Sequence, residues 1–238
     1  MSRGKSLLVS AIGIATVHIL SAQAHNNAWL RGTISIPVAT QIKIDNEWQY
    51  RRQYGLENSY FPGKHLMFSY RSWIHYQRSK ELKYSVSPFA YFSNYRIIRG
   101  KGDDTIRPTP EVRFSAALAW QPALMKQLVL VSRAAIEYRV HGSGQTDNAR
   151  LSNRLGLVYT INRELEADLF EELLFNFPGT STCCFLDQSR VGIDLGCRVL
   201  PYLGCNLGYM HITRSPLISK GKFSENNIFL NLTYKLTH

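Results

Sequence analysis

The sequence predicts an all-β protein, an antiparallel up-and-down transmembrane β-barrel of ten to twelve strands. Apolar and polar residues alternate almost continuously after residue 28. The alternating segments are mostly 11 to 15 residues long, and the connections between them are short and long in turn. Successive side chains of a strand point to opposite faces, so alternation indicates strands. Their length and their connections are typical of a barrel that crosses an outer membrane.

The first element, residues 1–24, is predicted to be a cleaved secretory signal peptide, which leaves 25–238 as a single β-barrel domain. The start of the chain is basic, 7–20 is largely apolar, and Ala22-Gln23-Ala24 supplies a small-residue cleavage pattern. The apolar stretch is too short and too polar for a membrane anchor. Position 25 is His rather than Cys, which excludes a lipoprotein anchor at this cleavage site. The protein is therefore expected to be exported to the outer membrane of a Gram-negative cell.

The strands come next, and 110–121 illustrates their pattern. Phe114 and Leu118 fall on one face, whereas Glu111 and Arg113 fall on the other. Strands of soluble proteins usually have about 5 or 6 residues, and tilted membrane strands need about 9 to 11. Eleven segments share this pattern, namely 29–36, 41–51, 65–77, 82–96, 110–121, 127–140, 149–161, 164–177, 186–199, 202–213 and 225–236.

The connections predict which end of the barrel faces outward. Short periplasmic turns and longer outer loops are typical of outer-membrane barrels, so the long links 97–109 and 141–148 are expected outside. Bacterial single-chain barrels have even strand numbers. On that rule 41–51 is the first strand of a ten-stranded barrel and 29–36 is an extra strand or tail. A twelve-stranded barrel with one strand missed remains open.

Aromatic residues near the segment ends are expected to form girdles at the two membrane interfaces. The chain has 13 Tyr, 11 Phe and 4 Trp. The last segment alternates cleanly and resembles the C-terminal recognition strand of outer-membrane barrels, although the chain ends in His238 rather than in an aromatic residue. The predicted girdle residues are Trp29, Tyr50, Tyr76, Trp120, Tyr138, Tyr159, Phe177 and Tyr209.

The polar face of the strands is strongly ionic and predicts a charged lumen. Buried charges must be paired and hydrogen-bonded, so one interpretation is a salt-bridged plug that fixes the strand register. The other is a narrow polar pore or ligand cavity with an Arg-rich wall. Glu171 falls on the apolar face, and a bulge or a position near the rim would explain it. The lumen or ligand residues selected from this face are Arg71, Arg113, Arg133, Glu137, Arg139, Arg154, Glu172, Arg190 and Asp194.

The sequence offers few candidate groups for catalysis or for binding a metal or cofactor. A carboxylate cluster at Glu166, Asp168 and Glu172 and a His211-Ile-Thr213 element are candidate catalytic groups, but neither comes with a recognisable orienting partner. His75 is expected to be a hydrogen-bonded lumen residue rather than a base. No catalytic residue, metal site or cofactor is therefore assigned.

The four cysteines do not form a zinc pattern, because no C-x-x-C and no matched His pair occur. An oxidising compartment permits disulfides. Cys197 and Cys205 lie on adjacent segments and could pair across a tight turn, or remain small lipid-facing residues. Cys183 and Cys184 lie in an expected outer loop and could bridge to a partner chain.

Composition and charge restrict the partners. The 238 residues include 28 Lys and Arg against 17 Asp and Glu, a net charge of +11, and 45% are hydrophobic, which excludes a disordered chain. Export and strand patterning oppose nucleic-acid binding. Outer-membrane lipid is the expected partner, and the sequence predicts no oligomeric state. Anionic lipid or glycan is expected at the basic outer loops, at Arg96, Arg99, Lys101, Lys220 and Lys222.

Several stretches resemble a family of exported Gram-negative proteins called domain of unknown function 2490. The resemblance covers most of the mature chain and is most specific from Glu172 to Tyr209. It implies an outer-membrane barrel of undefined activity and transfers no catalytic residue. This chain departs from the pattern at Leu186 and at the cysteine pair 183–184. The matching elements are Trp29, Arg51 or Arg52, Arg133–Arg139, Arg150, Arg154, Glu172–Phe177, Phe185–Arg190 and Leu207–Met210.

The sequence therefore predicts a small integral outer-membrane barrel with a salt-bridged ionic lumen and a structural, surface-interaction or narrow-pore role. Two alternatives belong to other classes. One is a lipid-modifying outer-membrane enzyme built on His211, and the other is a soluble periplasmic barrel that binds a small apolar ligand. The sequence favours a role without catalysis.

Overall fold

The computed structural model describes residues 25–56, 61–142, 146–177, 186–215 and 223–236. The expected signal peptide, Cys183, Cys184, Lys220 and Lys222 lie outside these ranges. Within them no helix is both long and apolar enough to span a membrane. The described elements are β1 (His25–Ala39), β2 (Ile42–Gln53), β3 (Lys64–Gln77), β4 (Leu82–Asn94), the 3-10 turn η1 (Asp103–Thr105), β5 (Thr109–Trp120), β6 (Ala123–Met125), β7 (Leu128–His141), β8 (Asn148–Thr160), β9 (Leu165–Asn176), β10 (Leu186–Leu200), β11 (Leu203–Arg214) and β12 (Phe223–Lys235).

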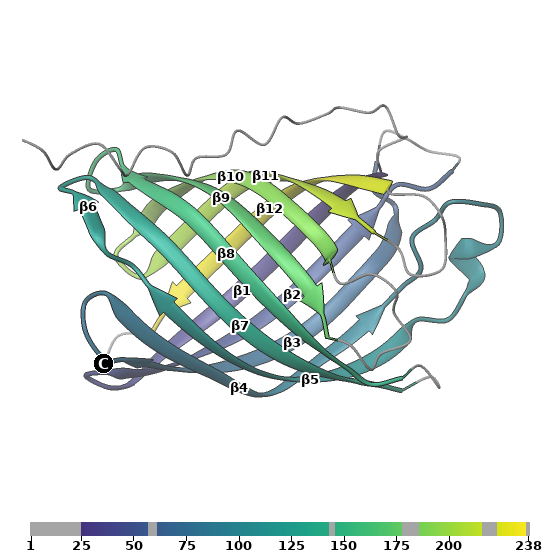
Figure 1. The fold of residues 1–238 in the computed structure, drawn as a ribbon. Helices are drawn as coiled ribbons and strands as arrows, with labels where there is room; N and C mark the ends of the chain where they lie inside the picture. The colour runs from purple at the N-terminus through teal and green to yellow at the C-terminus, as the bar shows by residue number, and fades with distance from the viewer. Residues whose placement is uncertain (1–24, 57–60, 143–145, 178–185, 216–222, 237–238) are drawn as a thin grey trace, which may run out of the picture.

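These strands form one sheet that closes on itself, as Figure 1 shows. Consecutive strands pair antiparallel, and β5 pairs with β7 across the three-residue β6. The ring closes between β1 and β12, which run parallel, from the pair His25–Glu225 to the pair Ser35–Lys235. All eleven predicted segments are strands of the described wall.

The predicted antiparallel barrel of ten to twelve strands is confirmed, although the strand number is odd and the rule of even numbers does not hold. The wall has eleven strands, β1 to β5 and β7 to β12, because the segment expected as a tail is a full wall strand that pairs with both β2 and β12. A meander of antiparallel strands that closes with an odd number must bring its first and last strands together parallel. The short β6 adds no twelfth strand, since it pairs with β7 through two residue pairs.

The connections follow the predicted alternation. The short turns, including the one between Ala39 and Ile42, lie at one end of the barrel, and the long connections, including 95–108, lie at the other. In Figure 1 the short turns are on the left, and the connection 95–108 is on the right. The parallel strands β1 and β12 both begin at the long-connection end.

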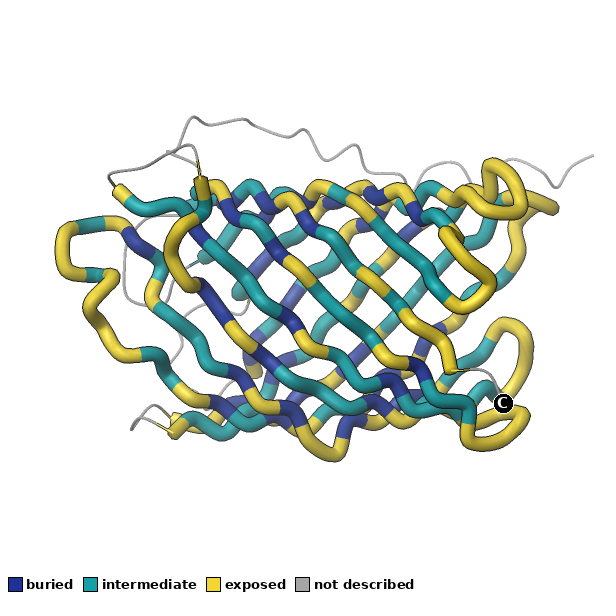
Figure 2. The backbone as a smooth tube through the Cα atoms, turned by 180° about the vertical axis from the view of Figure 1, so that it is seen from behind, coloured by how far each residue is buried: buried dark blue, intermediate teal, exposed yellow. Residues whose placement is uncertain are grey.

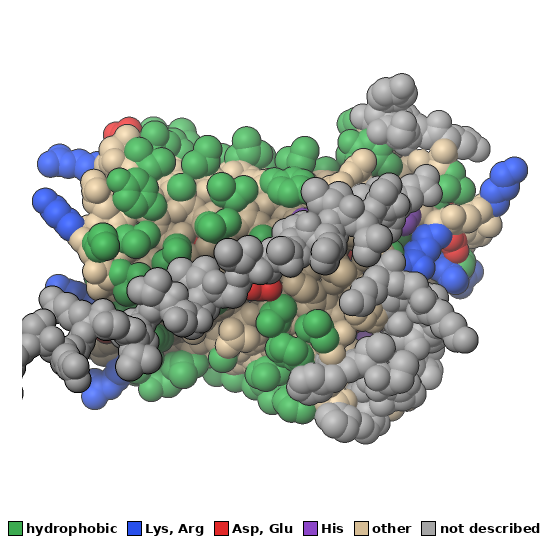
Figure 3. Space-filling view, turned by 45° about the horizontal axis from the view of Figure 1, so that its top comes forward, with side chains coloured by type: hydrophobic (Ala, Val, Ile, Leu, Met, Phe, Trp, Pro, Cys, Tyr) green, Lys and Arg blue, Asp and Glu red, His purple; other side chains and the backbone are tan. Residues whose placement is uncertain are grey.

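The two faces of the wall differ as predicted. In β5 the side chains of Glu111 and Arg113 are buried, whereas Phe114 and Trp120 are exposed on the outside. Figure 2 shows this alternation of buried and exposed positions along the strands, and Figure 3 shows hydrophobic side chains gathered on the outer face. Glu171 is an exposed exception, and its pairs with Val191 and Leu155 lie in unbroken register. A bulge therefore does not explain it, and neither does a position at the rim, because Glu171 lies mid-strand.

Part of the inner face is apolar. Trp29, Phe170, Met210, Ile212 and Phe229 form a buried cluster beneath β9, β11, β12 and β1. Glycine provides the space for it: a Cβ on Gly192 would lie 2.5 Å from Cζ of Phe170. The girdle assignment of Trp29 was wrong, because this side chain is 6% exposed and turns inward with Arg31 and Arg51.

Candidate functional site

The lumen contains a cavity of about 400 Å³ with a strongly cationic lining. Four carboxylates, Asp45, Glu47, Glu137 and Glu172, also line it. Its nine basic side chains come from strands on all sides of the barrel, and they are Arg31, Arg51, Arg71, Lys83, Arg113, Arg133, Arg150, Arg154 and Arg190. The described lining is therefore basic in excess, which favours anions over cations in the cavity.

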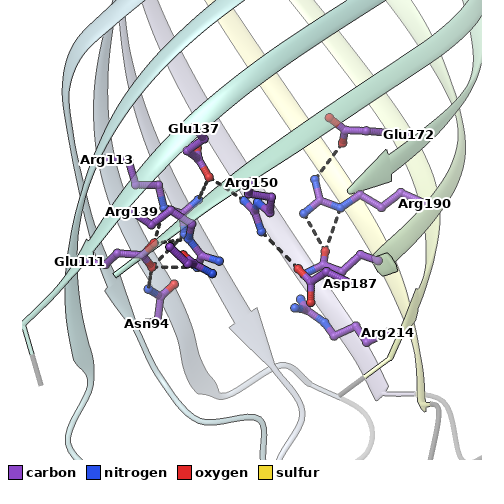
Figure 4. A network of polar contacts seen from close by, with 12 residues as sticks. Asn94, Glu111, Arg113, Glu137, Arg139, Arg150, Glu172, Asp187, Arg190 and Arg214 are labelled. Carbon is purple, nitrogen blue, oxygen red and sulfur yellow. Dashed lines mark hydrogen bonds and ion pairs between the residues drawn. The ribbon is translucent and has the colours of Figure 1, made fainter. Parts of the chain in front are cut away.

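Two carboxylates hold three of these arginines in place and also bind Arg139, which lies outside the lining (Figure 4). Glu137 accepts hydrogen bonds from Arg71 at 2.7 Å, from Arg150 at 2.8 Å and from Arg113 at 3.2 Å. Glu111 accepts from Arg113 at 2.8 and 3.0 Å and also binds Arg139. Because the residues come from β3, β5, β7 and β8, the network ties four strands together.

A second set of ion pairs joins β8, β9 and β10. Arg190 donates to Glu172 at 2.9 Å, and Arg154 donates to Asp168 at 2.5 Å. Asp194 accepts from the amide of Asn206 at 2.9 Å. Pairing of this kind offsets the cost of burying charge and fixes which strands lie opposite each other. Figure 4 shows Glu172 and Arg190 pointing toward each other inside the barrel.

The structure places all nine selected lumen residues on the inner face. Arg139 binds Glu111, and Asp194 lines a neighbouring cavity. The other seven line the cavity described above. Arg133 differs from the rest, because no carboxylate of the described residues lies within ion-pair distance of it. The ion pairs of the described residues thus include most of the predicted set but not Arg133 or Asp194.

Aromatic stacking in the lumen was not predicted. The guanidinium carbon of Arg51 lies 3.5 Å from the ring centroid of Trp29, and that of Arg154 lies 3.7 Å from the ring centroid of Phe170. Arg133 faces Trp73 at 5.4 Å. Such contacts are favourable because the ring face is negative. The strand period was the available signal, since Trp29 has the same parity as Arg31.

The cavity continues toward the short-turn end. A second cavity of about 420 Å³ shares seven lining residues with the first, among them Arg31, Arg51 and Glu172. A third, also about 420 Å³, shares Glu166, Asn206 and Thr233 with the second and is lined by turn residues such as Pro201. A chain of polar spaces therefore runs from the ionic network to the short-turn end.

At the opposite end the connection between β4 and β5 packs against the barrel. The side-chain amide of Gln53 donates to the carbonyl of Arg96 at 2.9 Å, and its oxygen accepts from the backbone N–H of Ile98 at 3.1 Å. Ile98 is buried as a result. Arg99 lies over the ring of Phe223 at 3.8 Å. This connection is thus held against the barrel.

The basic residues of the β4–β5 connection differ in whether they have partners within the protein. Arg96 pairs with Asp103 at 3.0 Å, and the backbone N–H groups of Arg99 and Gly100 donate to Asp103, which lowers the pKa of that carboxyl. Arg96, Arg99 and Lys101 are all exposed, but Arg96 and Arg99 have partners within the protein.

The candidate catalytic groups are not brought together. Glu166, Asp168 and Glu172 face the lumen, where Asp168 and Glu172 are held by arginines. His211 faces outward and contacts the side-chain oxygen of Asn226 at 3.0 Å. No group of three His, Cys, Asp or Glu that could hold a metal occurs among the described residues.

Two further expectations concern His75 and the cysteines. His75 contacts Ser85 at 2.7 Å and Asp45 at 3.1 Å, so it is a hydrogen-bonded lumen residue. Cys197 and Cys205 lie directly opposite each other across β10 and β11, and both are free thiols.

Comparison with known proteins identifies the family. The sequence profile described as "Protein of unknown function (DUF2490)" matches residues 26–216. The chain belongs to the DUF2490 family. No curated protein matches this DUF2490 protein.

Solved structures resemble the DUF2490 barrel at low sequence identity. The structure titled "NanC porin structure in rhombohedral crystal form" has 8% identity and a TM-score of 0.50, and the match covers 88% of this chain and 98% of that one. "Bacterial polysaccharide outer membrane secretin" has 9% identity, a TM-score of 0.47 and coverage of 81% and 63%. "LpxR from Salmonella typhimurium" has 7% identity, a TM-score of 0.47 and coverage of 80% and 83%. The first likeness concerns the fold alone.

Proposed function

We propose that this DUF2490 protein is exported to the outer membrane and forms a narrow pore for small polar solutes there. The observation that carries the proposal is the apolar outer face and the ionic interior of the barrel. This distribution of polarity is the reverse of that in a soluble protein. Large hydrophobic side chains are exposed on the wall strands, for example Phe68, Ile136, Leu155 and Ile228. Soluble monomers rarely expose apolar patches larger than a few hundred Å². Lipid is the solvent that fits this surface.

The cavities support a pore rather than a purely structural plug. The three spaces share lining residues from the ionic network to the short turns. The Glu111 and Glu137 network and the buried Ile98 narrow the route at the other end. The proposed pathway is therefore narrow and selective rather than wide. The solved structure with the matching fold carries the word porin in its title, and that word describes the other protein.

Lipid of the outer membrane is the partner that the proposal requires. An anionic lipid or glycan headgroup at the long-connection end is the second partner in the proposal, and Lys101 is an exposed cation of the β4–β5 connection that would meet it. Arg96 and Arg99 contribute less to such a surface, because they are engaged with Asp103 and Phe223.

The alternatives find less support. An apolar ligand would require an apolar pocket, but the lumen cavities are lined mainly by polar and charged groups. A hydrolase built on His211 would need an acidic orienting residue, and the described contact of His211 is the amide of Asn226.

Membrane insertion is tested by fractionation and gel mobility. The mature chain should remain in the membrane fraction, and the unheated protein should migrate differently from boiled protein, because a closed strand ladder has no free edge to unravel. Recovery in the soluble periplasmic fraction without a mobility shift would refute the membrane assignment.

Conduction is tested separately in planar bilayers. The purified barrel should open small, steady conductance steps in KCl. Arg154→Ala should change their size, since this side chain lines both main cavities. Arg78→Ala, in the exposed β3–β4 turn, is the matched control. Inserted protein that never conducts would contradict the pore and leave a structural barrel.

A further inference from the structure

We infer that the lumen holds a binding subsite for a small oxyanion-bearing solute, formed by Arg31, Arg51 and Arg133. The inference deepens the proposed function, since it names the solute class that the lumen accepts. Oxyanion here means a carboxylate or phosphate group carried by a small molecule.

The three arginines share a property that separates them from the other arginines of the cavity. Arg71, Arg113, Arg150, Arg154 and Arg190 each have a carboxylate partner. Among the described residues, no carboxylate lies within 4.0 Å of any guanidinium nitrogen of Arg31, Arg51 or Arg133. A guanidinium stays charged at any physiological pH, so these three charges need compensation from another source.

All three side chains line the same space. Arg31 and Arg51 project from the paired strands β1 and β2, and Arg133 projects from β7. Each lines the cavity of about 400 Å³, and the first two also line the cavity that continues toward the short turns. The three charges therefore border one open volume rather than separate spaces.

Stacking orients the arginines for in-plane binding. Trp29 covers one face of the Arg51 guanidinium at 3.5 Å, and Trp73 lies beside Arg133 at 5.4 Å. A guanidinium with a covered face still presents its N–H groups at the edge. The fork of N–H donors matches the two oxygens of a carboxylate or phosphate. Arg51 uses one edge nitrogen for Gln49 at 3.0 Å, which further fixes its orientation.

Size and charge define the ligand class. A volume of about 400 Å³ lies within the range of about 300 to 1,000 Å³ typical of small-molecule sites. Glu47 and Glu172 line the same space and would repel a second negative group close to them. The site thus fits a compact polar solute with one anionic end.

Binding can be measured without conduction. Trp29 and Trp73 lie in the lumen beside the proposed site, so tryptophan fluorescence of the full mature chain folded in detergent should report occupancy. The probes are inorganic phosphate and gluconate, with sorbitol as the neutral counterpart of gluconate and KCl at matched ionic strength. We expect saturable changes with the two oxyanions, and no saturable change with sorbitol or KCl. A response to one oxyanion alone still supports the site and identifies its source as phosphate or carboxylate.

Three variants sharpen the test. Arg51→Gln and Arg133→Gln should each weaken oxyanion binding about tenfold or more, because a charge-assisted hydrogen bond is lost. Arg133→Gln guards against misfolding, since Arg133 makes no described hydrogen bond that the change would remove. Arg78→Gln removes the same charge from an exposed turn and should bind like the parent.

The outcomes separate this inference from the pore. Absence of a saturable oxyanion response, or equal affinity in parent and Arg133→Gln protein, would overturn the subsite. Saturable binding without bilayer conductance would keep the subsite and refute the pore. Conductance without oxyanion binding would keep the pore and refute the subsite.

Discussion

The guanidinium of Arg51 stacks on the indole of Trp29, its direct partner across the β1–β2 pair, with 3.5 Å between guanidinium carbon and ring centroid. The first two wall strands are thereby joined inside the lumen by a side-chain contact. Their contact links the apolar cluster beneath β9 to β12 with the cationic cavity. The lumen is thus a single packed interior in which aromatic rings orient the charges.

Replacing Glu137 should destabilise the barrel strongly. Glu137→Gln removes the charge that Arg71, Arg113 and Arg150 share, and loss of one partner in a buried ionic group costs about 3 to 5 kcal/mol. Urea unfolding in detergent should show a lower midpoint. Glu81→Gln, in an exposed turn, should leave the midpoint in place. Equal midpoints for the two variants would count against the network.

Gly192→Ala should lower the free energy of unfolding by about 1 to 3 kcal/mol, because the new methyl group would meet the ring of Phe170. Gly32→Ala is the matched control on the same barrel, since a Cβ there has no neighbour within 4 Å. The comparison is made by denaturant unfolding monitored by fluorescence. If Gly192→Ala proved as stable as Gly32→Ala, the close packing of Phe170 would be refuted.

Glu171→Leu should stabilise the membrane-inserted barrel by about 1 kcal/mol or more, because an outward carboxylate in mid-wall is costly in lipid. The measurement is the unfolding midpoint in phospholipid bilayers. Glu164→Leu, in the exposed β8–β9 turn, is the control and should have little effect. A barrel that lost stability on Glu171→Leu would indicate that this carboxylate has a required partner.

Mild oxidation should join Cys197 to Cys205 within one chain. Directly opposite residues of antiparallel strands have Cα atoms about 4.5 to 5.5 Å apart, which lies within the range that a disulfide spans. Maleimide labelling of unfolded protein should fall after oxidation and recover with reductant. Cys205→Ser should abolish the protection of Cys197. Persistent labelling of both thiols after oxidation would place them out of reach of each other.

Much of the wall could be predicted from the sequence, because the alternation of apolar and polar residues can be seen within each strand separately. Every strand of a membrane barrel has this alternation, since one of its faces meets lipid and the other meets the lumen. The inward positions of Arg113, Glu137 and Arg154 follow from this alternation alone. The strand number did not follow, since a rule about even counts outweighed the clear pattern of 29–36. Only long-range pairing distinguishes a wall strand from a tail.

The interior was harder to predict. Which arginine meets which carboxylate depends on register and tilt, so the sharing of Glu137 by three arginines had no local signal. Trp29 was misplaced because aromatic residues near strand ends are common at membrane interfaces. Its parity with Arg31 indicated the lumen, and parity is the more reliable guide where the register is unbroken.

The parallel β1–β12 seam has a consequence for how the chain folds. Every other pair of wall strands in the described sheet consists of strands that follow each other along the chain. These pairs can form in turn, as each new hairpin adds to the sheet. The seam instead joins Asn27 to Glu225, 198 positions apart, through a hydrogen bond of 2.8 Å. Distant contacts are entropically the last to become favourable. Ring closure is therefore the expected late step of folding, and before it an open curved sheet would carry two unpaired edges.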